Sequence, residues 1–510
     1  MADHSANNKR IAKNTMMLYV RMLFSMLVSL YTSRVILQTL GVEDYGIYNV
    51  VGGVVSMFSL ISSSLSSAIS RFMTFELGRG DKQKLKTVFS TSITIQVIIS
   101  FIVVVLAEII GIWFLNNKMV IPAERMVAAN WIFQFSLVTF VVWLISVPYN
   151  AAIIAHERMK AFAYIGILEV LTKLGIVFSL MVAPIDRLVF YGLLLMLLSL
   201  VIRIVYGVYC KRNFEECTYS FVIDKPLLKE MFGFAGWNSV GNIAALLKDQ
   251  GVNILLNLFF GPIVNASRGI ALQVRGAIQG FVNNFVTAIN PQITKSYASG
   301  EREYMMSLIF KSARFSFYIL SLFVIPILLN SEYILNLWLG EVPEYSVIFL
   351  QLSLIYVLSE SLANPLITAQ LATGKIRNYQ IVVGGLLMLN FPIDYALLWM
   401  GYSPEIVYYV AIIISVCCEI ARIYMLHRMI GLSAFKFFRE VIFNVLAVFF
   451  VALIVPCGLK ILMPISFTYF IVMSLISVVC TMISILYVGC NENERLFFLS
   501  KIRIFFSRIK

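Results

Sequence analysis

Residues 97–107 read VIISFIVVVLA, a run with a single hydroxyl and no charge. Two later apolar runs also carry no charge, VIFNVLAVFFVALIV at 441–455 and FTYFIVMSLISVV at 467–479. Of the 510 residues, 60% are hydrophobic and 13% are charged. A soluble domain carries about 25% charged residues. These stretches therefore predict an all-α membrane protein rather than a set of soluble domains.

Hydropathy predicts about fourteen transmembrane helices, because a spanning helix needs about 20 mostly apolar residues. Twelve is the alternative number, since the later spans are the least certain. The predicted spans are 12–38, 46–70, 88–115, 124–152, 161–183, 187–210, 231–260, 263–292, 311–330, 345–372, 379–400, 404–427, 440–463 and 465–488.

The distribution of basic residues orients these spans. Most of the 40 Lys and Arg residues lie at alternate ends, which the positive-inside rule assigns to the cytoplasm. The opposite loops hold only Lys118, Arg125, Arg187 and Lys460. Both termini are therefore predicted to be cytoplasmic, and the first apolar run is predicted to be a span rather than a signal peptide. The net charge of +13 follows from this topology, and no basic, aromatic-rich soluble domain indicates nucleic acid.

An internal repeat divides the chain. Residues 68–81 read AISRFMTFELGRGD and residues 288–301 read AINPQITKSYASGE, so Thr74 pairs with Thr294 and Gly80 with Gly300 at an offset of 220. Residues 148–160 (PYNAAIIAHERMK) and 365–377 (PLITAQLATGKIR) pair at an offset of 217, led by Pro148 and Pro365. An even number of helices separates the repeats, which predicts two parallel halves, as in some transporters.

The repeat predicts a domain order. We expect an N-lobe at 1–212, a cytoplasmic linker at 213–230, a C-lobe at 231–428, two added helices at 429–489 and a basic cytoplasmic tail at 490–510. The tail ends in LFFLSKIRIFFSRIK and is expected to lie along an anionic membrane surface, and an additional docked helix is the alternative.

The sequence resembles the polysaccharide-transporter branch of the multidrug/oligosaccharidyl-lipid/polysaccharide (MOP) exporter superfamily, the O-antigen-type lipid-linked oligosaccharide flippases. The resemblance covers nearly the whole chain and rests on the basic first span (14–50), the two repeated turns and the two prolines. It implies a MATE-like fold of two six-helix lobes around a central cavity, lined by the first, second, seventh and eighth spans. It also implies alternating access.

Polar residues follow one face of the seventh and eighth spans. At 100° per residue, the first five residues below fall within an arc of roughly 100° and the other five within roughly 80°. A lipid-facing stripe of this polarity would be costly, so both faces are expected to line water or protein. The residues are Asn238, Asn242, Asp249, Asn253 and Asn257, and Arg268, Arg275, Gln279, Asn283 and Asn290.

We expect these faces to bind a pyrophosphate and sugars, because Arg and Lys bind phosphate and Asn both donates to and accepts from hydroxyls. An interhelical salt-bridge lock is the alternative reading of the same charges. The predicted substrate-binding residues are Arg21, Arg34, Lys248, Asp249, Arg268, Arg275, Asn242, Asn253, Gln279 and Asn283.

Three intramembrane carboxylates have no obvious partner one turn away on their own helix: Asp249, Glu360 and Asp394. One of them is expected to bind a coupling proton or sodium ion. Glu360 is the better proton candidate, and Asp249 the better ion-pair member because Lys248 adjoins it.

The sequence contains no cluster of histidines, no metal-ligand spacing and no nucleophile motif, so no catalytic residue, metal site or cofactor is predicted. The family resemblance implies export of an undecaprenyl-pyrophosphate-linked oligosaccharide, so the favoured function is a flippase that moves this substrate across a bacterial inner membrane during polysaccharide or lipopolysaccharide biosynthesis. The alternatives are a cation-coupled multidrug exporter of the same fold and a non-transporting membrane scaffold. The expected partners are the lipid-linked oligosaccharide, membrane lipids and, as a further option, a polysaccharide polymerase and other assembly proteins.

Overall fold

The computed structural model describes residues 2–56, 59–117, 121–222, 224–339, 342–462, 466–496 and 499–500. These residues are almost entirely helical, as predicted, and they fold into two units. Unit 1 comprises Met1–Ser239 and Thr294–Gly300, and unit 2 comprises Val240–Ile293 and Glu301–Lys510. The border falls inside a helix at Ser239/Val240, whereas the sequence places its linker at 213–230.

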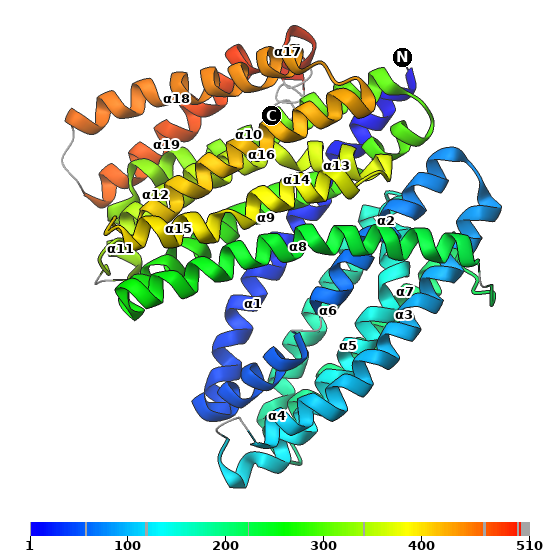
Figure 1. Cartoon of the computed structure of the whole chain (residues 1–510). Helices are drawn as coiled ribbons and strands as arrows, with labels where there is room; N and C mark the ends of the chain where they lie inside the picture. The colour runs from blue at the N-terminus through cyan, green and yellow to red at the C-terminus, as the bar shows by residue number, and fades with distance from the viewer. Residues whose placement is uncertain are drawn as a thin grey trace, which may run out of the picture. The chain divides into compact units, whose positions relative to one another are not determined.

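Unit 1 is built from the helices α1 to α7, the first part of α8 and the end of α9 (Figure 1). Within it, α5 packs against α1, α2, α3, α6 and α7, so it is the central element of the unit. The elements are α1 (Ala2–Ser56), α2 (Ser59–Arg79), α3 (Lys82–Leu106), η1 (Ala107–Gly111), α4 (Ile112–Asn117), η2 (Ala123–Arg125), α5 (Met126–Ala155), α6 (Met159–Ser179), η3 (Leu180–Val182), α7 (Arg187–Asn213) and the first part of α8 (Lys225–Phe260).

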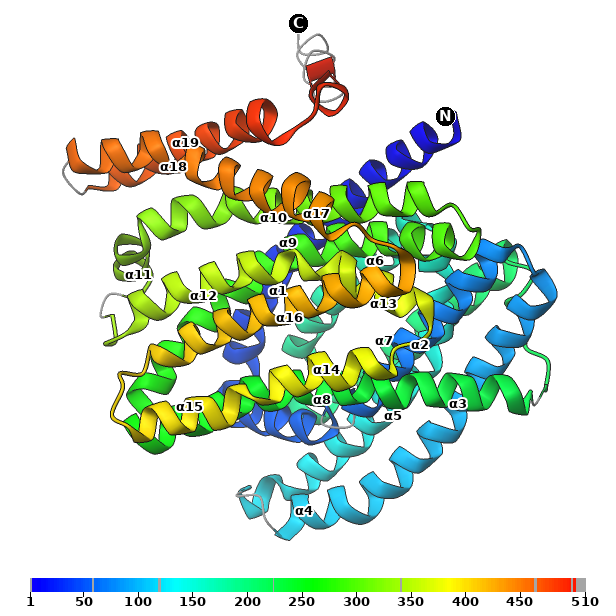
Figure 2. The same ribbon diagram turned by 45° about the horizontal axis from the view of Figure 1, so that its top comes forward.

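The remaining elements build unit 2, apart from the end of α9. Here α16 packs against α12, α13, α14 and α15, while α18 and α19 lie side by side against α10 (Figure 2). The elements are α9 (Pro262–Ala298), α10 (Arg302–Leu329), α11 (Ser331–Leu339), α12 (Ser346–Ser361), α13 (Ala363–Thr373), α14 (Arg377–Met388), α15 (Asn390–Trp399), α16 (Ile406–Ile430), α17 (Ala434–Phe437), η4 (Phe438–Ile442), α18 (Phe443–Leu462), α19 (Phe467–Ser484) and η5 (Ile485–Gly489).

Eleven helices among the described residues are long and apolar enough to cross a membrane, so the predicted number of fourteen is not confirmed. The predicted spans 46–70, 231–260 and 263–292 are not among these eleven, and each of them includes positions outside the part of the chain on which this number rests. They correspond to the end of α1 with α2, to α8 and to α9. The predicted break between 38 and 46 is also absent, because α1 continues to Ser56.

The repeated turns lie close together within unit 1. Gly80 and Gly300 both adopt positive φ, 77° and 81°, one residue after the last residue of α2 and two residues after the last residue of α9. A Cβ on Gly78 would lie 2.8 Å from Cα of Lys295 and 3.0 Å from Cβ of Ala298. Since Ala298 is the repeat partner of Gly78, the two halves touch at equivalent positions. Glycine is required there because the helix backbones approach too closely for a side chain.

An ion-pair network joins three elements of unit 1 near the predicted outer surface. Nε of Arg125 donates to Asp44 at 2.7 Å and Nη1 donates to Asp186 at 2.6 Å. Asp186 also caps α7 by accepting from the backbone N–H of Val189 at 3.1 Å. Burial by itself raises the pKa of the Asp186 carboxyl, but the hydrogen bonds from Arg125 and Val189 outweigh it and hold that pKa below its ordinary value.

This network predicts a pH-dependent contribution to stability. A carboxyl whose folded pKa is depressed stabilises the fold above its unfolded pKa of about 3.9, and the contribution is lost as the pH falls through the folded pKa. Asp186→Asn should therefore lower the thermal unfolding temperature in detergent at pH 7, and the difference from the native chain should shrink at about pH 3. Glu215→Gln, which alters an 84% exposed carboxylate, is the control. An equal deficit at both pH values would contradict the prediction.

The C-terminal helices dock on α10 around one glycine. The carbonyl of Gly489 accepts from the hydroxyl of Tyr318 at 3.1 Å, from Arg314 at 3.1 Å and from Asn444 at 3.3 Å. A Cβ at Gly489 would lie 2.7 Å from the Tyr318 hydroxyl oxygen and 3.0 Å from Val448. The position therefore needs glycine for space.

We expect Gly489→Ala to destabilise the protein by about 1–3 kcal/mol through overpacking, with reduced abundance in the membrane. Gly458→Ala is the matched control, because it lies on α18 with nothing within 4 Å of the added Cβ. It should be neutral or slightly stabilising. Equal abundance of the two variants would show that α18 and α19 do not depend on this contact.

Candidate functional site

Asp249 on α8 lies among three cations of unit 2. Its carboxylate is 3.9 Å from Nζ of Lys248, 3.9 Å from Nη2 of Arg268 and 4.0 Å from Nη2 of Arg275. These are long ion pairs, and the Asp249 side chain is 41% exposed. The polar faces of α8 and α9 thus meet within unit 2, and the carboxylate neutralises part of their positive charge.

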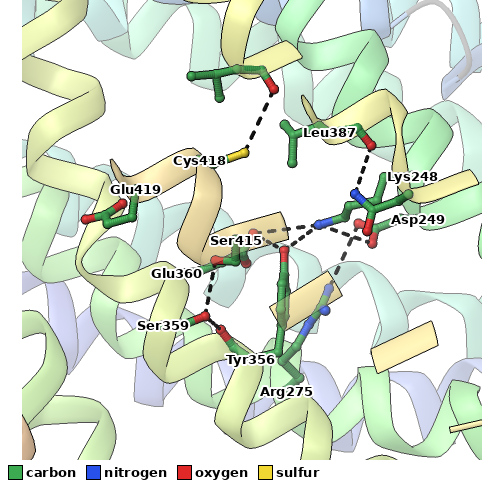
Figure 3. Close-up of polar contacts among 12 residues, drawn as sticks. Lys248, Asp249, Arg275, Tyr356, Ser359, Glu360, Leu387, Ser415, Cys418 and Glu419 are labelled. Carbon is green, nitrogen blue, oxygen red and sulfur yellow. Dashed lines mark hydrogen bonds and ion pairs between the residues drawn. The ribbon is translucent and has the colours of Figure 1, made fainter. Parts of the chain in front are cut away.

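A second carboxylate joins Lys248 from α12. The Lys248 amine donates a hydrogen bond to the hydroxyl of Tyr356, and that hydroxyl donates to Glu360 one turn later (Figure 3). Nζ of Lys248 is also 3.7 Å from Oε1 of Glu360. Only 9% of the Lys248 side chain is exposed, so this amine depends on its neighbours for the solvation that it loses. We call Lys248, Asp249, Arg268, Arg275, Tyr356 and Glu360 the charged cluster.

Tyr356 is the residue that the sequence analysis missed. Its ring lies under two cations, with the centroid 4.7 Å from Nζ of Lys248 and 5.5 Å from the guanidinium carbon of Arg275. A tyrosine in an apolar span looks like a packing residue. In the sequence, its position four residues before Glu360 is what indicates that the two side chains lie on the same face of a helix.

The three cations differ in how firmly they are held. Arg268 is 5% exposed, and its Nη1 donates to the backbone carbonyl of Asp249 at 3.0 Å and to the side chain of Asn253. Arg275 is 20% exposed, and its contact with Asp249 is at 4.0 Å. Arg275 is therefore the cation best placed to exchange its carboxylate for another anion.

A small cavity of about 20 Å³ opens beside the cluster, between α8, α9, α12, α15 and α16. It is large enough for about one water molecule. Apart from the cluster, polar groups of Asn390 and Tyr408 line it. A site of this size holds an ion or a water, so a larger head group would require the surrounding helices to move.

The other predicted residues are distributed more widely. Nε2 of Gln279 donates to Asn283 at 3.4 Å on α9, and Asn242 lies half-buried on α8. Arg21 belongs to unit 1, where its guanidinium stacks on Phe162 at 4.4 Å. The side chains of Arg34 and Asn257 lie outside the described part of the chain.

Asp394 on α15 has an unusual environment. Its side chain is fully buried, and neither carboxylate oxygen has a hydrogen-bond partner among the described residues. Asn390, one turn earlier, donates to the carbonyl of Leu387 at 2.8 Å. Of the three predicted coupling carboxylates, Asp249 and Glu360 thus contact cations, while Asp394 is the buried carboxylate without a hydrogen-bond partner.

Residues 11–297 match the family described as polysaccharide biosynthesis protein, which is more than half of the chain. The chain belongs to that family. A curated relative, the uncharacterized membrane protein EpsK of Bacillus subtilis (strain 168), is 23% identical over 332 residues. The match spans 64% of each chain, slightly less than two thirds of the relative's length.

Solved structures of the MOP superfamily share the fold. An outward-facing multidrug resistance transporter of the MATE family has a TM-score of 0.71 at 12% identity, over 83% of this chain and 96% of that chain. A transporter from Pyrococcus furiosus has a TM-score of 0.65 at 13% identity, again over 83% and 96%. This protein is therefore a member of a polysaccharide biosynthesis family, and its fold is MATE-like.

The Lys248–Glu360 contact predicts a double-mutant result. Lys248→Met should destabilise the protein, because it leaves Glu360 and Asp249 less neutralised, and adding Glu360→Leu should recover part of the loss. The coupling energy should be about 1 kcal/mol, toward the low end of measured values because Glu360 is 40% exposed.

The measurement is thermal unfolding in detergent of the native chain, both single variants and the double variant. Lys173→Met is the control, since Lys173 pairs with Glu169 on its own helix at 2.7 Å. It should not couple to Glu360→Leu. Strict additivity of Lys248→Met and Glu360→Leu would show that the contact contributes nothing.

Proposed function

We propose that the protein is a flippase that moves an undecaprenyl-pyrophosphate-linked oligosaccharide from the cytoplasmic to the outer leaflet of a bacterial inner membrane. It works by alternating access, with both termini in the cytoplasm. The family supports a role in polysaccharide assembly, and the fold supports transport. The charge of the substrate is inferred from the charged cluster.

The observation that carries the proposal is the concentration of cations on α8 and α9. Three cations share two carboxylates in direct contact, and the ion pairs with Asp249 are long. A pyrophosphate that crosses hydrocarbon must lose water at a cost of many kcal/mol. Arg275 offers it a bidentate contact, and Lys248 offers a point charge. As the diphosphate displaces Asp249, one ionic partner replaces another and the cations stay neutralised.

The sugar part needs hydrogen bonds rather than charge. Asn242, Asn253, Gln279 and Asn283 lie on the same two helices and can both donate to and accept from hydroxyls. Arg21 and Arg34 would supply further contacts from α1. In the proposed cycle, these side chains lower the free energy that it costs to bury the sugar hydroxyls.

We assign the coupling step to a proton or sodium ion bound by Asp249, Glu360 or Asp394. Asp394 has the strongest case on geometry, because a buried carboxylate without a hydrogen-bond partner is costly when ionised and empty. A bound proton or cation would remove that cost. Glu360 has less need of one, since Lys248 and Tyr356 already contact it.

The fold is also that of multidrug exporters, so a cation-coupled drug exporter is the competing function. A cationic drug would need an anionic cavity, and the charged cluster holds more cations than carboxylates. The net positive charge of the cluster therefore favours an anionic substrate.

We further propose that the protein assembles with a polysaccharide polymerase, which would follow from its role in polysaccharide assembly.

Replacement of Arg275 separates these readings. Arg275→Gln should reduce glycan export at least tenfold at normal abundance, because a charge-assisted hydrogen bond contributes about 1.5–3 kcal/mol. Arg275→Lys should also be impaired if the guanidinium holds phosphate through two bonds, since Lys keeps only the charge. The measurement is the amount of lipid-linked glycan that accumulates inside, and of polysaccharide outside, in a deletion host complemented with each variant.

Lys311→Gln is the control, because it removes a positive charge from α10 outside the charged cluster. Normal export by Arg275→Gln and Lys248→Gln at normal abundance would exclude the cationic site. Loss of export that only follows loss of protein would leave the salt-bridge lock as the role of these residues.

A further inference from the structure

The turn between α5 and α6 contains a strained residue. Glu157 adopts φ of +58°, a left-handed conformation that L-residues other than Asn and Asp rarely take. The N–H of Arg158 donates to the carbonyl of Ile153 at 3.0 Å, and the N–H of Glu157 donates to that of Ile154 at 2.9 Å. This is a Schellman ending, in which the left-handed position is usually glycine.

The second half of the chain uses glycine at the same place. The offset of 217 that pairs Pro148 with Pro365 also pairs Glu157 with Gly374, which ends α13 at φ of +75°. The two turns are therefore equivalent in sequence and in backbone, and only the first one carries a side chain. Strain at a site where glycine would serve indicates that the side chain has a task.

The carboxylate of Glu157 is fully buried between two cations. Oε2 is 2.9 Å from Nε of Arg10 on α1, and Oε1 is 2.7 Å from Nζ of Lys295 on α9. Asn14, one turn after Arg10, donates to the backbone carbonyl of Glu157 at 3.2 Å. These pairs are at least 1 Å shorter than those around Asp249, and the Glu157 side chain is 0% exposed.

Lys295 lies where α9 passes from one unit to the other. Residues 262–293 of α9 belong to unit 2, whereas Thr294–Gly300 belong to unit 1. Pro291 lies three residues before this border, where its missing N–H leaves the carbonyl of Thr287 without its usual helical donor. A bend of α9 at Pro291 would leave Thr294–Gly300 in unit 1, whereas release of that segment would leave α9 straight.

We propose that Glu157 is a latch that holds Thr294–Gly300 of α9 in unit 1, and that the transport cycle requires its release. The proposal rests on the transport function above, because only a chain that changes conformation needs a releasable contact. The buried ion pair between Glu157 and Lys295 is the switch, and Pro291 supplies the joint on the other side of the border. The left-handed backbone aims the carboxylate of Glu157 at Lys295.

Glu157→Gly is the decisive variant, because the turn accepts glycine without strain and loses only the carboxylate. The readout is chemical labelling of Ser296→Cys, since Ser296 is 4% exposed on the latched segment. Membrane vesicles that carry the full chain are treated with a water-soluble maleimide, and labelling is quantified by peptide mass spectrometry, which separates position 296 from the native cysteines. Combining Glu157→Gly with Ser296→Cys should raise the labelling rate about tenfold over Ser296→Cys alone.

Lys295→Met should also raise the labelling rate. Combining it with Glu157→Gly should add little, because each change alone already removes the ion pair between Glu157 and Lys295. Glu215→Gln, which breaks the exposed pair with Lys82, is the matched control and should leave labelling unchanged. Labelling that stays at the native rate in both Glu157→Gly and Lys295→Met overturns the latch. So does a fully additive effect.

If Glu157→Gly does not reach the membrane, Lys295→Met alone decides the proposal by the same labelling. The readout needs no substrate, so the latch can be supported while export of the proposed glycan fails, and it can be overturned while export is normal.

Discussion

Burying a charge in a membrane protein costs free energy that only a partner charge, a hydrogen bond or water can offset. Lys248 shows how this constraint organises unit 2. Its amine has lost nearly all contact with solvent, and it is compensated by the hydroxyl of Tyr356, by Glu360 and by Asp249. Those groups come from α8 and α12, so the neutralisation of this amine joins side chains of the two helices. The side chains of Arg268 and Arg275 extend the same arrangement along α9.

Most helices could be predicted because hydropathy and the positive-inside rule act on local sequence. The span predicted at 187–210 corresponds to α7 (Arg187–Asn213), and that at 404–427 to α16 (Ile406–Ile430). The continuation of α1 to Ser56 could not be predicted, because Gly41, Glu43 and Asp44 look like a loop. Asp44 stays in the helix because Arg125 pairs with it from the start of α5, a contact across 81 positions.

The site was partly predictable for the same reason. The polar stripes on α8 and α9 follow from helical periodicity, and the contacts of Lys248, Asp249, Arg268 and Arg275 agree with the side on which they were placed. The pairing of Lys248 with Glu360 is separated by 112 positions, so only the tertiary structure could provide it. Glu157 escaped notice because a carboxylate in a loop looks solvated, and its left-handed backbone leaves no mark on the sequence.

α9 connects the two ion-pair systems. It carries Arg275 in the charged cluster and Lys295 in the latch, twenty residues apart, or about 30 Å along a straight helix. The pair at Arg275 is long and partly exposed, which suits exchange with a mobile anion, whereas the pair at Lys295 is short and mostly buried, which suits a switch with two distinct states. Pro291 lies between them. A substrate bound at Arg275 and the latch at Lys295 would therefore act on one helix, α9, on opposite sides of Pro291.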